Sequence, residues 1–265
     1  MRFASLGSGS EGNSLIVEVA DGATTTRVML DCGFGIREAE KRLARLDLQA
    51  GDLDAIFVTH EHGDHIGGVM KLAKKHRIPV WLTYGTYSAA FAAAPFAVLN
   101  ADDSVQFHLI DNHTPLVIGD LEITPYPVPH DAREPTQFVF GDGNVRLGVL
   151  TDVGSTTAYI ESTLSGCDAL VLEANHDEDM LGGGPYPASL KRRVGGRFGH
   201  LSNAQSAELL KRLDCSKLKH LLAAHLSRQN NTPALAQYAF AGALDCAPEW
   251  VGIADQDQGF DWRSL

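Results

Sequence analysis

Cysteine is scarce in this sequence, and long apolar runs and positive charge are also in short supply. The cysteines are scattered without CxxC spacing, which argues against a disulfide framework and against a thiolate metal site. We expect reduced, packed thiols at Cys32, Cys167, Cys215 and Cys246. No apolar run approaches the ~20 residues that span a bilayer, and no signal-peptide pattern opens the chain. We therefore expect a cytoplasmic protein with no membrane partner.

The deficit of positive charge restricts the possible partners. The 33 acidic residues outnumber the 22 basic ones and give a net charge of -11, so the molecule as a whole repels nucleic acid. A phosphate-rich partner would have to meet a local basic patch. The length of 265 residues and the hydrophobic content of 44% allow one large α/β domain or two small ones.

The densest chemical signal lies between Thr59 and Gly68, where the sequence reads His-x-His-x-Asp-His over His60, His62, Asp64 and His65. An apolar run that predicts a short buried strand precedes it, and a helix can start directly after it. Imidazole nitrogens and a carboxylate oxygen are ligands for zinc, manganese or iron. Because the motif contains no cysteine, a catalytic metal site is favoured over a closed structural zinc site.

Three further candidate ligands each follow an apolar segment that predicts a strand. His130 comes after the stretch 126–129, Asp152 after 149–151 and His225 after 221–224. A polar group in this position either caps the next turn or faces a site. The residues alone leave both possibilities open, but they supply enough ligands for a pair of metal ions.

The rest of the chain alternates between strand and helix patterns. We expect strands over 1–6, 15–19, 27–33, 55–58 and 79–82, and helices over 36–46, from 67 to about 77, and over 88–92. The charged residues of the first helix, including Arg42, should face away from its apolar side. A capping box at Ser202 and the pair Thr232-Pro233 predict two further helix starts. Short strands between 105 and 149 suggest a second sheet.

The His-x-His-x-Asp-His motif and the three later ligands resemble the metallo-β-lactamase superfamily. This resemblance implies an α/β fold, a four-layer αβ/βα sandwich of two mixed β-sheets flanked by helices, formed by residues 1–265 as a single domain. It implies that a first metal ion is held by His60, His62 and His130, a second by Asp64, His65 and His225, with Asp152 as the bridge. It also implies that Asp31 orients a ligand histidine. Two divalent metal ions can share a hydroxide that acts as the nucleophile of a hydrolysis.

Two histidine motifs resemble the phosphodiesterases of this superfamily, especially the tRNA-maturing RNase Z enzymes. His200 lies in a Gly-His-Leu-Ser-Asn stretch, and His176 follows an apolar strand in Asn-His-Asp. We expect Asp64, His176 and His200 to be catalytic residues, with His200 as the general acid. The alternative for each of the latter two is an ordinary structural histidine, such as one bonded to backbone at a helix start.

Together with the stretches 10–14 and 225–231, these motifs resemble the bacterial YycJ/WalJ-like branch of the superfamily. That resemblance implies a 5′-to-3′ exonuclease acting on DNA 5′ ends in a mismatch-repair context. We expect the substrate to be bound by Lys191, Arg192, Arg193, Arg197, Arg228 and Asn13. The alternative for the basic run is a solvated helix face. The segment between Asp152 and His225 is too short for an inserted β-CASP domain, so a loop over 180–187 with Tyr186 would have to contact the DNA.

Two other functions remain open at this stage. The acidic total charge would suit a hydrolase of small molecules, such as a cyclic phosphate, a thioester or a lactone. A metal-bound protein that binds a partner without turnover is the third possibility.

Overall fold

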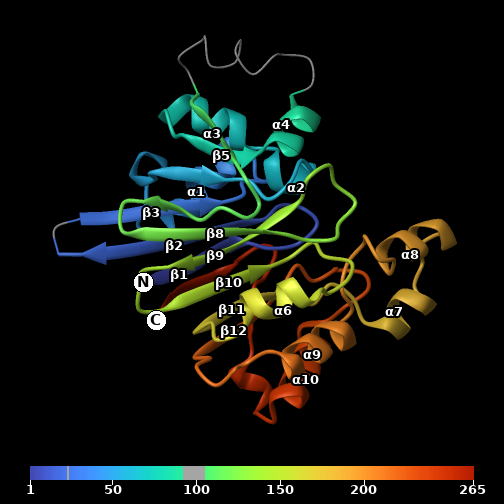
Figure 1. The fold of residues 1–265 in the computed structure, drawn as a ribbon. Coiled ribbons are helices and arrows are strands. Elements are labelled where there is room, and N and C mark those ends of the chain that lie inside the picture. Colours follow the sequence, from blue (N-terminus) through green and yellow to red (C-terminus); the bar gives the residue numbers. More distant parts are fainter. Residues whose placement is uncertain (23, 92–104) are drawn as a thin grey trace.

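Two β-sheets form the centre of the molecule (Figure 1). The computed structural model describes residues 1–22, 24–91 and 105–265. The strands of the first sheet lie in the order β14 (Phe260–Ser264), β1 (Arg2–Gly7), β2 (Ser14–Asp21), β3 (Thr24–Leu30), β4 (Ala55–Phe57), β5 (Val80–Thr83) and β6 (Phe107–Ile110). Those of the second sheet lie in the order β13 (Gly252–Ile253), β12 (His220–Ala224), β11 (Ala169–Glu173), β10 (Arg146–Leu150), β9 (Thr136–Gly141), β8 (Leu121–Pro127) and β7 (Leu116–Ile118).

Both sheets are mixed, as the resemblance implies. In the first sheet β3 to β6 run parallel, whereas β14, β1, β2 and β3 pair antiparallel. In the second sheet β10 to β13 run parallel, whereas β7 to β10 pair antiparallel. The parallel strands are linked by helices, which must cross over the outer face of each sheet.

Most helices cover the outer faces of the two sheets, whereas the two helices between residues 178 and 194 protrude to one side (Figure 1). The α-helices of the described residues are α1 (Ile36–Ala44), α2 (Gly63–Ile66), α3 (Val69–His76), α4 (Tyr84–Ala90), α6 (Ala158–Leu164), α7 (Glu178–Gly183), α8 (Ala188–Val194), α9 (Asn203–Arg212) and α10 (Pro233–Leu244). Short 3-10 helices span Ala50–Asp52 and Pro248–Trp250. Helices α1, α3 and α4 pack on the first sheet, and α6, α9 and α10 pack on the second.

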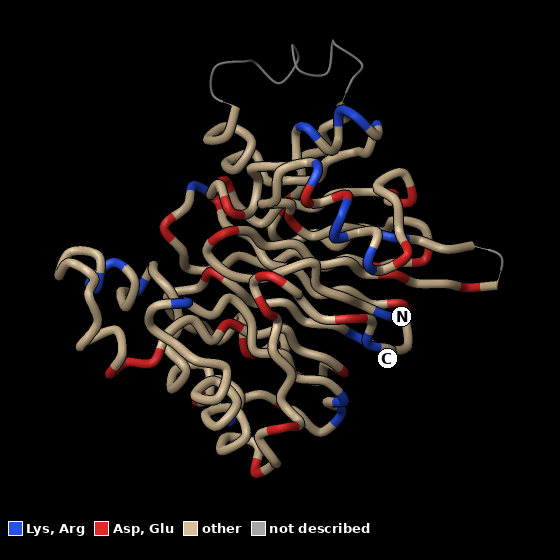
Figure 2. Tube along the Cα trace, turned by 180° about the vertical axis from the view of Figure 1, so that it is seen from behind, with Lys and Arg blue, Asp and Glu red and all other residues tan. Residues whose placement is uncertain are grey.

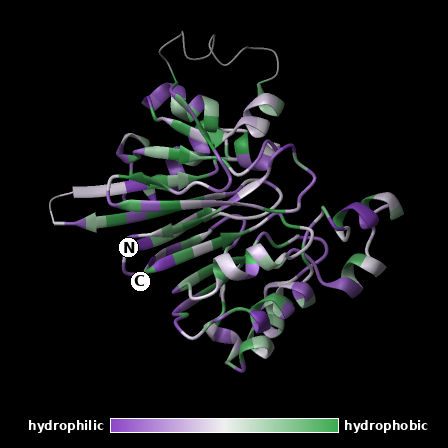
Figure 3. Ribbon diagram, in the orientation of Figure 1, coloured by the Kyte–Doolittle hydropathy of each residue, from purple (hydrophilic) through white to green (hydrophobic). Residues whose placement is uncertain are grey.

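Three apolar clusters separate the resulting four layers, and Figure 3 shows hydrophobic residues interspersed with polar ones along the strands. Strand β11 contributes to two of these clusters, because its side chains alternate between the two faces of the sheet. Leu170 and Leu172 pack against the helices, whereas Val171 packs between the sheets against residues such as Phe138. The central cluster takes residues from both sheets. This shared core supports our proposal that residues 1–265 form one domain.

Several local predictions are confirmed and two need correction. Ser202 caps α9 in a capping box with Gln205, and Thr232 caps α10. The helix predicted over 88–92 begins earlier, at Tyr84, because the Thr83 hydroxyl accepts the first-turn N–H that starts it; residue 92 lies outside the described residues.

Arg42 of α1 does not face solvent as predicted. Its side chain is buried over the ring of Phe34, and its Nη1 donates to the carbonyl oxygens of Leu6 and Gln256 at 2.7 and 2.9 Å. These carbonyls belong to loops that are distant in sequence, so the helical pattern alone could not reveal them.

All four cysteines are unpaired; Cys32 and Cys167 are buried as expected, whereas Cys215 and Cys246 are only partly buried against the core. Across residues 1–22, 24–91 and 105–265, no helix combines the length and the apolar character needed to cross a membrane.

Candidate metal centre

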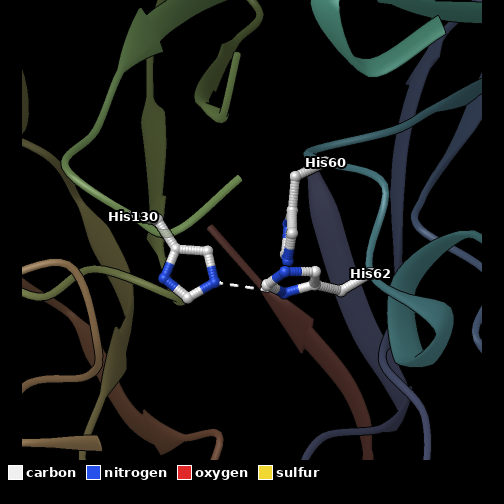
Figure 4. Close-up of side chains that lie close together, drawn as sticks. All are labelled: His60, His62 and His130. Atoms are coloured by element: carbon white, nitrogen blue, oxygen red, sulfur yellow. Dashed lines mark hydrogen bonds between the residues drawn. The ribbon is translucent and has the colours of Figure 1, made fainter. Parts of the chain in front are cut away.

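The first three predicted ligands meet at the carboxyl ends of β4 and β8. His60 and His62 follow β4, and His130 follows β8 from the other sheet. Figure 4 shows the three rings facing one another. The ring centroid of His60 lies 4.6 Å from that of His62 and 4.9 Å from that of His130. Nε2 of His130 lies 3.3 Å from Nδ1 of His62. Nitrogens of the three rings are therefore close enough together to bind one cation.

A second group lies beside the first. Asp64 and His65 lie on the short helix α2, and His225 directly follows β12. The Asp64 Oδ2 lies 3.5 Å from Nε2 of His65 and 3.6 Å from Nε2 of His225. One ligand atom of each residue lies within 4.8 Å of the others. This arrangement could hold a second cation.

Asp152 lies between the two groups. Its Oδ2 is 3.2 Å from Nε2 of His65, and its Oδ1 is 3.5 Å from Nε2 of His225 and 3.9 Å from Nε2 of His130. Asp152 and His225 both adopt left-handed backbone conformations, with φ of 54° and 55°. Such conformations are costly for residues other than glycine and are typical of functional sites. They turn both side chains inward at the ends of their strands.

Four histidines are held so that Nε2 faces the centre. His65 donates from Nδ1 to Oδ2 of Asp31 at 2.7 Å, and His130 donates from Nδ1 to the carbonyl of Gly199 at 3.0 Å. The Thr59 hydroxyl donates to Asp31 and therefore accepts from Nδ1 of His60. Nδ1 of His225 lies 3.4 Å from a Glu173 oxygen. Partners of this kind fix the ring and the tautomer of a metal-ligating histidine.

Three polar atoms at the centre of the site lack a hydrogen-bond partner. Nε2 of His60, Nε2 of His225 and Oδ2 of Asp152 are buried without a hydrogen-bond partner. Burying a polar atom in this way costs free energy unless something else satisfies it. A divalent cation would do so, because imidazole nitrogens and carboxylate oxygens are its usual ligands. The residues therefore fit a metal site.

The electrostatics of the site agree with this fit. Burial disfavours the charged form of His225, but the Asp152, Asp64 and Glu173 carboxylates outweigh it and raise the pKa of His225 to about 10. Burial likewise disfavours the Asp152 carboxylate, but neighbouring histidines hold its pKa well below the ordinary value. A bound cation would supply the positive charge that these carboxylates otherwise take from a protonated histidine.

The glycine- and serine-rich loop before β2 also touches the site. Asn13 is buried, and its Nδ2 donates to Oδ2 and to the carbonyl oxygen of Asp64, each at 3.3 Å. The Ser8 hydroxyl accepts from the backbone N–H of His225 at 3.0 Å. A Cβ on Gly33 would lie 1.9 Å from the Asp64 carbonyl oxygen, so only glycine fits there. The two hydrogen bonds from Asn13 position Asp64. Asn13 itself does not line the open cavity beside the site.

That cavity has a volume of about 440 Å³ and opens over the ligands. His62, Asp64, Asp152 and His225 line it, together with His200. His200 Nδ1 donates to Glu173 Oε1 at 2.8 Å. Burial would lower the pKa of His200, but this carboxylate outweighs burial and raises it.

Sequence reasoning missed Glu173, which is the last residue of β11 and is fully buried. Its carboxylate also accepts the backbone N–H groups of Asp152, Val153 and Leu201. The sequence offered a signal for Glu173, because this carboxylate follows the apolar residues of β11 just as Asp152 follows those of β10.

His176, by contrast, does not line the cavity. It is buried, and its Nδ1 lies 3.3 Å from Oδ1 of Asn175. Its backbone carbonyl accepts from the N–H of Asn203 at the start of α9. The structure thus places His176 among groups that join β11 to α9.

The predicted basic residues separate into different surroundings. Arg193 lines the cavity, and its Nε donates to Asp131 Oδ2 at 2.6 Å. Lys191 donates to the carbonyl of Gly182, while Arg192 and Arg197 are exposed. Figure 2 shows Lys and Arg gathered on the protruding segment that carries α8. Arg228 lies apart from them and pairs with Glu11 and Asp257.

Comparisons with known proteins agree with this site. Residues 26–225 match the model of the beta-lactamase superfamily domain. The chain is 34% identical over 254 residues to the exodeoxyribonuclease YycJ of Bacillus anthracis, covering 96% of this chain and 93% of that one. It is 32% identical over 252 residues to the exodeoxyribonuclease WalJ of Streptococcus pneumoniae, covering 95% and 91%.

The fold agrees with that of a solved structure as well. Zn(2+)-bound PqqB from Methylobacterium extorquens superposes with a TM-score of 0.74 at 18% identity, with all of both chains covered. The family-model match and the two relatives lead to one assignment: this chain belongs to the metallo-β-lactamase superfamily, within its YycJ/WalJ-like branch.

Proposed function

We propose that this metallo-β-lactamase-fold hydrolase is a dinuclear metal-dependent phosphodiesterase that removes nucleotides from the 5′ ends of DNA, in the cytoplasm and in a mismatch-repair context. The observation that carries the proposal is the cavity in which His200, held by Glu173, faces the same space as the Asp152-centred ligand groups. The names of the two bacterial relatives support a nuclease.

The metal-holding roles follow the two groups described above. His60, His62 and His130 would hold one ion, Asp64, His65 and His225 the other, and Asp152 would reach both. When bound, divalent metal ions supply Lewis acidity and lower the pKa of water, whichever of zinc, manganese or iron they are. Asp64 also lines the cavity, so its carboxylate can orient water there.

His200 is suited to donate a proton to the leaving oxygen. Because Nδ1 is bonded to Glu173, the ring can present only Nε2 to the cavity. The carboxylate favours the charged imidazolium, and a positioned imidazolium is a general acid. Its Nε2 proton would pass to the 3′ oxygen of the released nucleotide.

A hydrolase of small molecules is the second candidate. The net charge of -11 disfavours DNA at long range, and a cavity of about 440 Å³ lies in the range of small-ligand sites. A cyclic phosphate, a thioester or a lactone would be its substrate.

The deciding experiment compares 5′-phosphorylated duplex DNA, bis-p-nitrophenyl phosphate and a thioester, with His60→Ala as the blank. Salt-sensitive release of mononucleotides from the DNA is the expected result. Turnover of the thioester alone would replace the proposal with the second candidate. No turnover with zinc, manganese or iron would favour a binding protein.

A further inference from the structure

The segment that carries α7 and α8 forms one wall of the cavity. Tyr186, Leu190, Arg193 and Val194 line it from that side. No residue of α8 is buried, so the helix contributes little to the core. It is nevertheless fixed in place beside the site. The backbone N–H of His200 donates to the Val194 carbonyl at 2.8 Å.

The approach of α8 to His200 is close. A Cβ on Gly199 would lie 2.1 Å from the Arg193 carbonyl and 2.2 Å from the Val194 carbonyl. Glycine is therefore required at this position for α8 to reach the site. A helix that has no fully buried residue and still approaches the site this closely is explained better by a ligand than by stability.

Arg193 is the only arginine or lysine on the cavity wall among the described residues. Its side chain is 62% exposed, and Nε donates to Asp131 Oδ2 at 2.6 Å. That bond orients the guanidinium from its inner edge, which leaves its two terminal nitrogens for another partner. A planar guanidinium with two free terminal nitrogens matches the oxygens of a phosphate. Asp131 itself lies 3.5 Å from Nε2 of His130, so this phosphate would lie next to the metal ligands.

The same wall offers an apolar surface beside the arginine. Leu190 and Val194 are four residues apart on α8 and share one side of it. Tyr186 precedes the helix and adds an aromatic ring to the wall. Aromatic rings bind nucleobases of any sequence by stacking. The cavity of about 440 Å³ is of the size that takes one small ligand, so it accommodates one nucleotide rather than a duplex.

We propose that this wall is a subsite for the terminal nucleotide of the substrate: Arg193, oriented by Asp131, binds its 5′-phosphate, and Tyr186 stacks on its base. This inference rests on the proposed function, because it specifies which end of DNA the metal site receives. The terminal nucleotide must leave its base pair to enter. The enzyme therefore selects phosphorylated ends that carry an intact first base.

The test measures kcat and KM on three duplexes that differ only at the 5′ end: phosphorylated, hydroxylated, and phosphorylated with an abasic first residue. Arg193→Gln should raise KM for the phosphorylated end about tenfold to a hundredfold, with a smaller change for the hydroxylated end. Tyr186→Ala should lose about fivefold or more in kcat/KM on the intact end and little on the abasic end, while Tyr186→Phe keeps the preference.

Two distant variants serve as matched controls. Arg37→Gln removes the same charge from an exposed position on α1, and Tyr238→Ala removes an exposed ring from α10. Both should leave every preference as in the wild type. Melting temperature and metal content of each variant are measured alongside, so that misfolding is recognised.

The outcomes separate the inference from the function on which it rests. If the wild type cleaves all three duplexes equally well, or Arg193→Gln behaves as Arg37→Gln does, the subsite is wrong and the nuclease stands. If the wild type cleaves no DNA but hydrolyses the thioester, both are wrong. Equal losses on DNA and on bis-p-nitrophenyl phosphate, which has no second phosphate, would show that Arg193 supports the metal site instead.

Discussion

Glu173 accepts a 2.8 Å hydrogen bond from Nδ1 of His200, although the two residues are 27 positions apart in the chain. Glu173 comes from the end of β11, and His200 comes from the segment between α8 and α9. The same carboxylate accepts the backbone N–H of Asp152 at 3.1 Å. One buried group thus connects the proposed proton donor to Asp152, the residue proposed to bridge two metal ions.

Replacing either member of this pair should impair turnover more than folding. We expect His200→Ala to lower kcat about 10²- to 10⁴-fold, because the leaving oxygen loses its proton donor. Glu173→Gln should also lower kcat, since a neutral amide no longer favours the imidazolium. Steady-state kinetics on phosphorylated duplex DNA measures both. Glu208→Gln, on the exposed surface of α9, is the control and should match the wild type. Full activity of His200→Ala would contradict the proposed role.

Asp31→Asn should weaken metal binding about 10- to 100-fold, because the Asp31 carboxylate holds Nδ1 of His65 at 2.7 Å and orients the ring. Titration against a competing chelator measures the affinity. Asp54→Asn is the matched control, since Asp54 is exposed and accepts the backbone N–H of Arg27. An unchanged affinity in Asp31→Asn would mean that the Thr59 hydroxyl suffices to hold the site.

Removal of metal should lower stability as well as activity. In the metal-free protein, the buried Nε2 atoms of His60 and His225 and Oδ2 of Asp152 have no bonding partner, which costs free energy. A metal present at a hundredfold its Kd stabilises the native state by about 2.7 kcal/mol, which corresponds to about 5 °C or more in Tm for a chain of this size. Calorimetry with and without chelator measures the shift. His60→Ala should show a clearly smaller shift than the wild type, and an equal one would place the metal elsewhere.

Glu18 predicts a pH-dependent contribution to stability that is independent of the metal site. Burial raises the pKa of Glu18, but bonds with Arg2 and Arg27 outweigh burial and lower it below 4.5. A lowered pKa stabilises the folded state above the unfolded value, and this gain is lost as the pH falls through the folded pKa.

Glu18→Gln should therefore cost about 1–2 kcal/mol near pH 7, between the values for exposed and fully buried pairs. The difference from the wild type should begin to shrink as the pH falls below the unfolded pKa of about 4.3, and it should vanish below the lower folded pKa, where Glu18 is protonated in both states. Urea unfolding across pH measures it. Glu38→Gln, which breaks a more exposed pair with Arg42, should cost less. A difference that stays constant down to pH 3 would contradict this account.

The sequence determined the features that depend on neighbouring residues. His60, Asp152 and His225 could be singled out as candidate ligands because each follows an apolar strand, and parallel strands end at the same edge of their sheet. The helix starts at Ser202 and Thr232 were predictable because a cap acts on its own first turn.

Only the tertiary structure decided which groups meet across the layers. Glu173 reaches His200, Asn13 reaches Asp64, and Arg42 turns inward because packing of the two sheets brings together loops that no local pattern relates. The structure likewise placed Arg193 on the cavity wall and Arg228 beside acidic residues. Helical and strand periodicity record which side of an element is apolar, whereas the partner of a polar side chain depends on contacts made far along the chain.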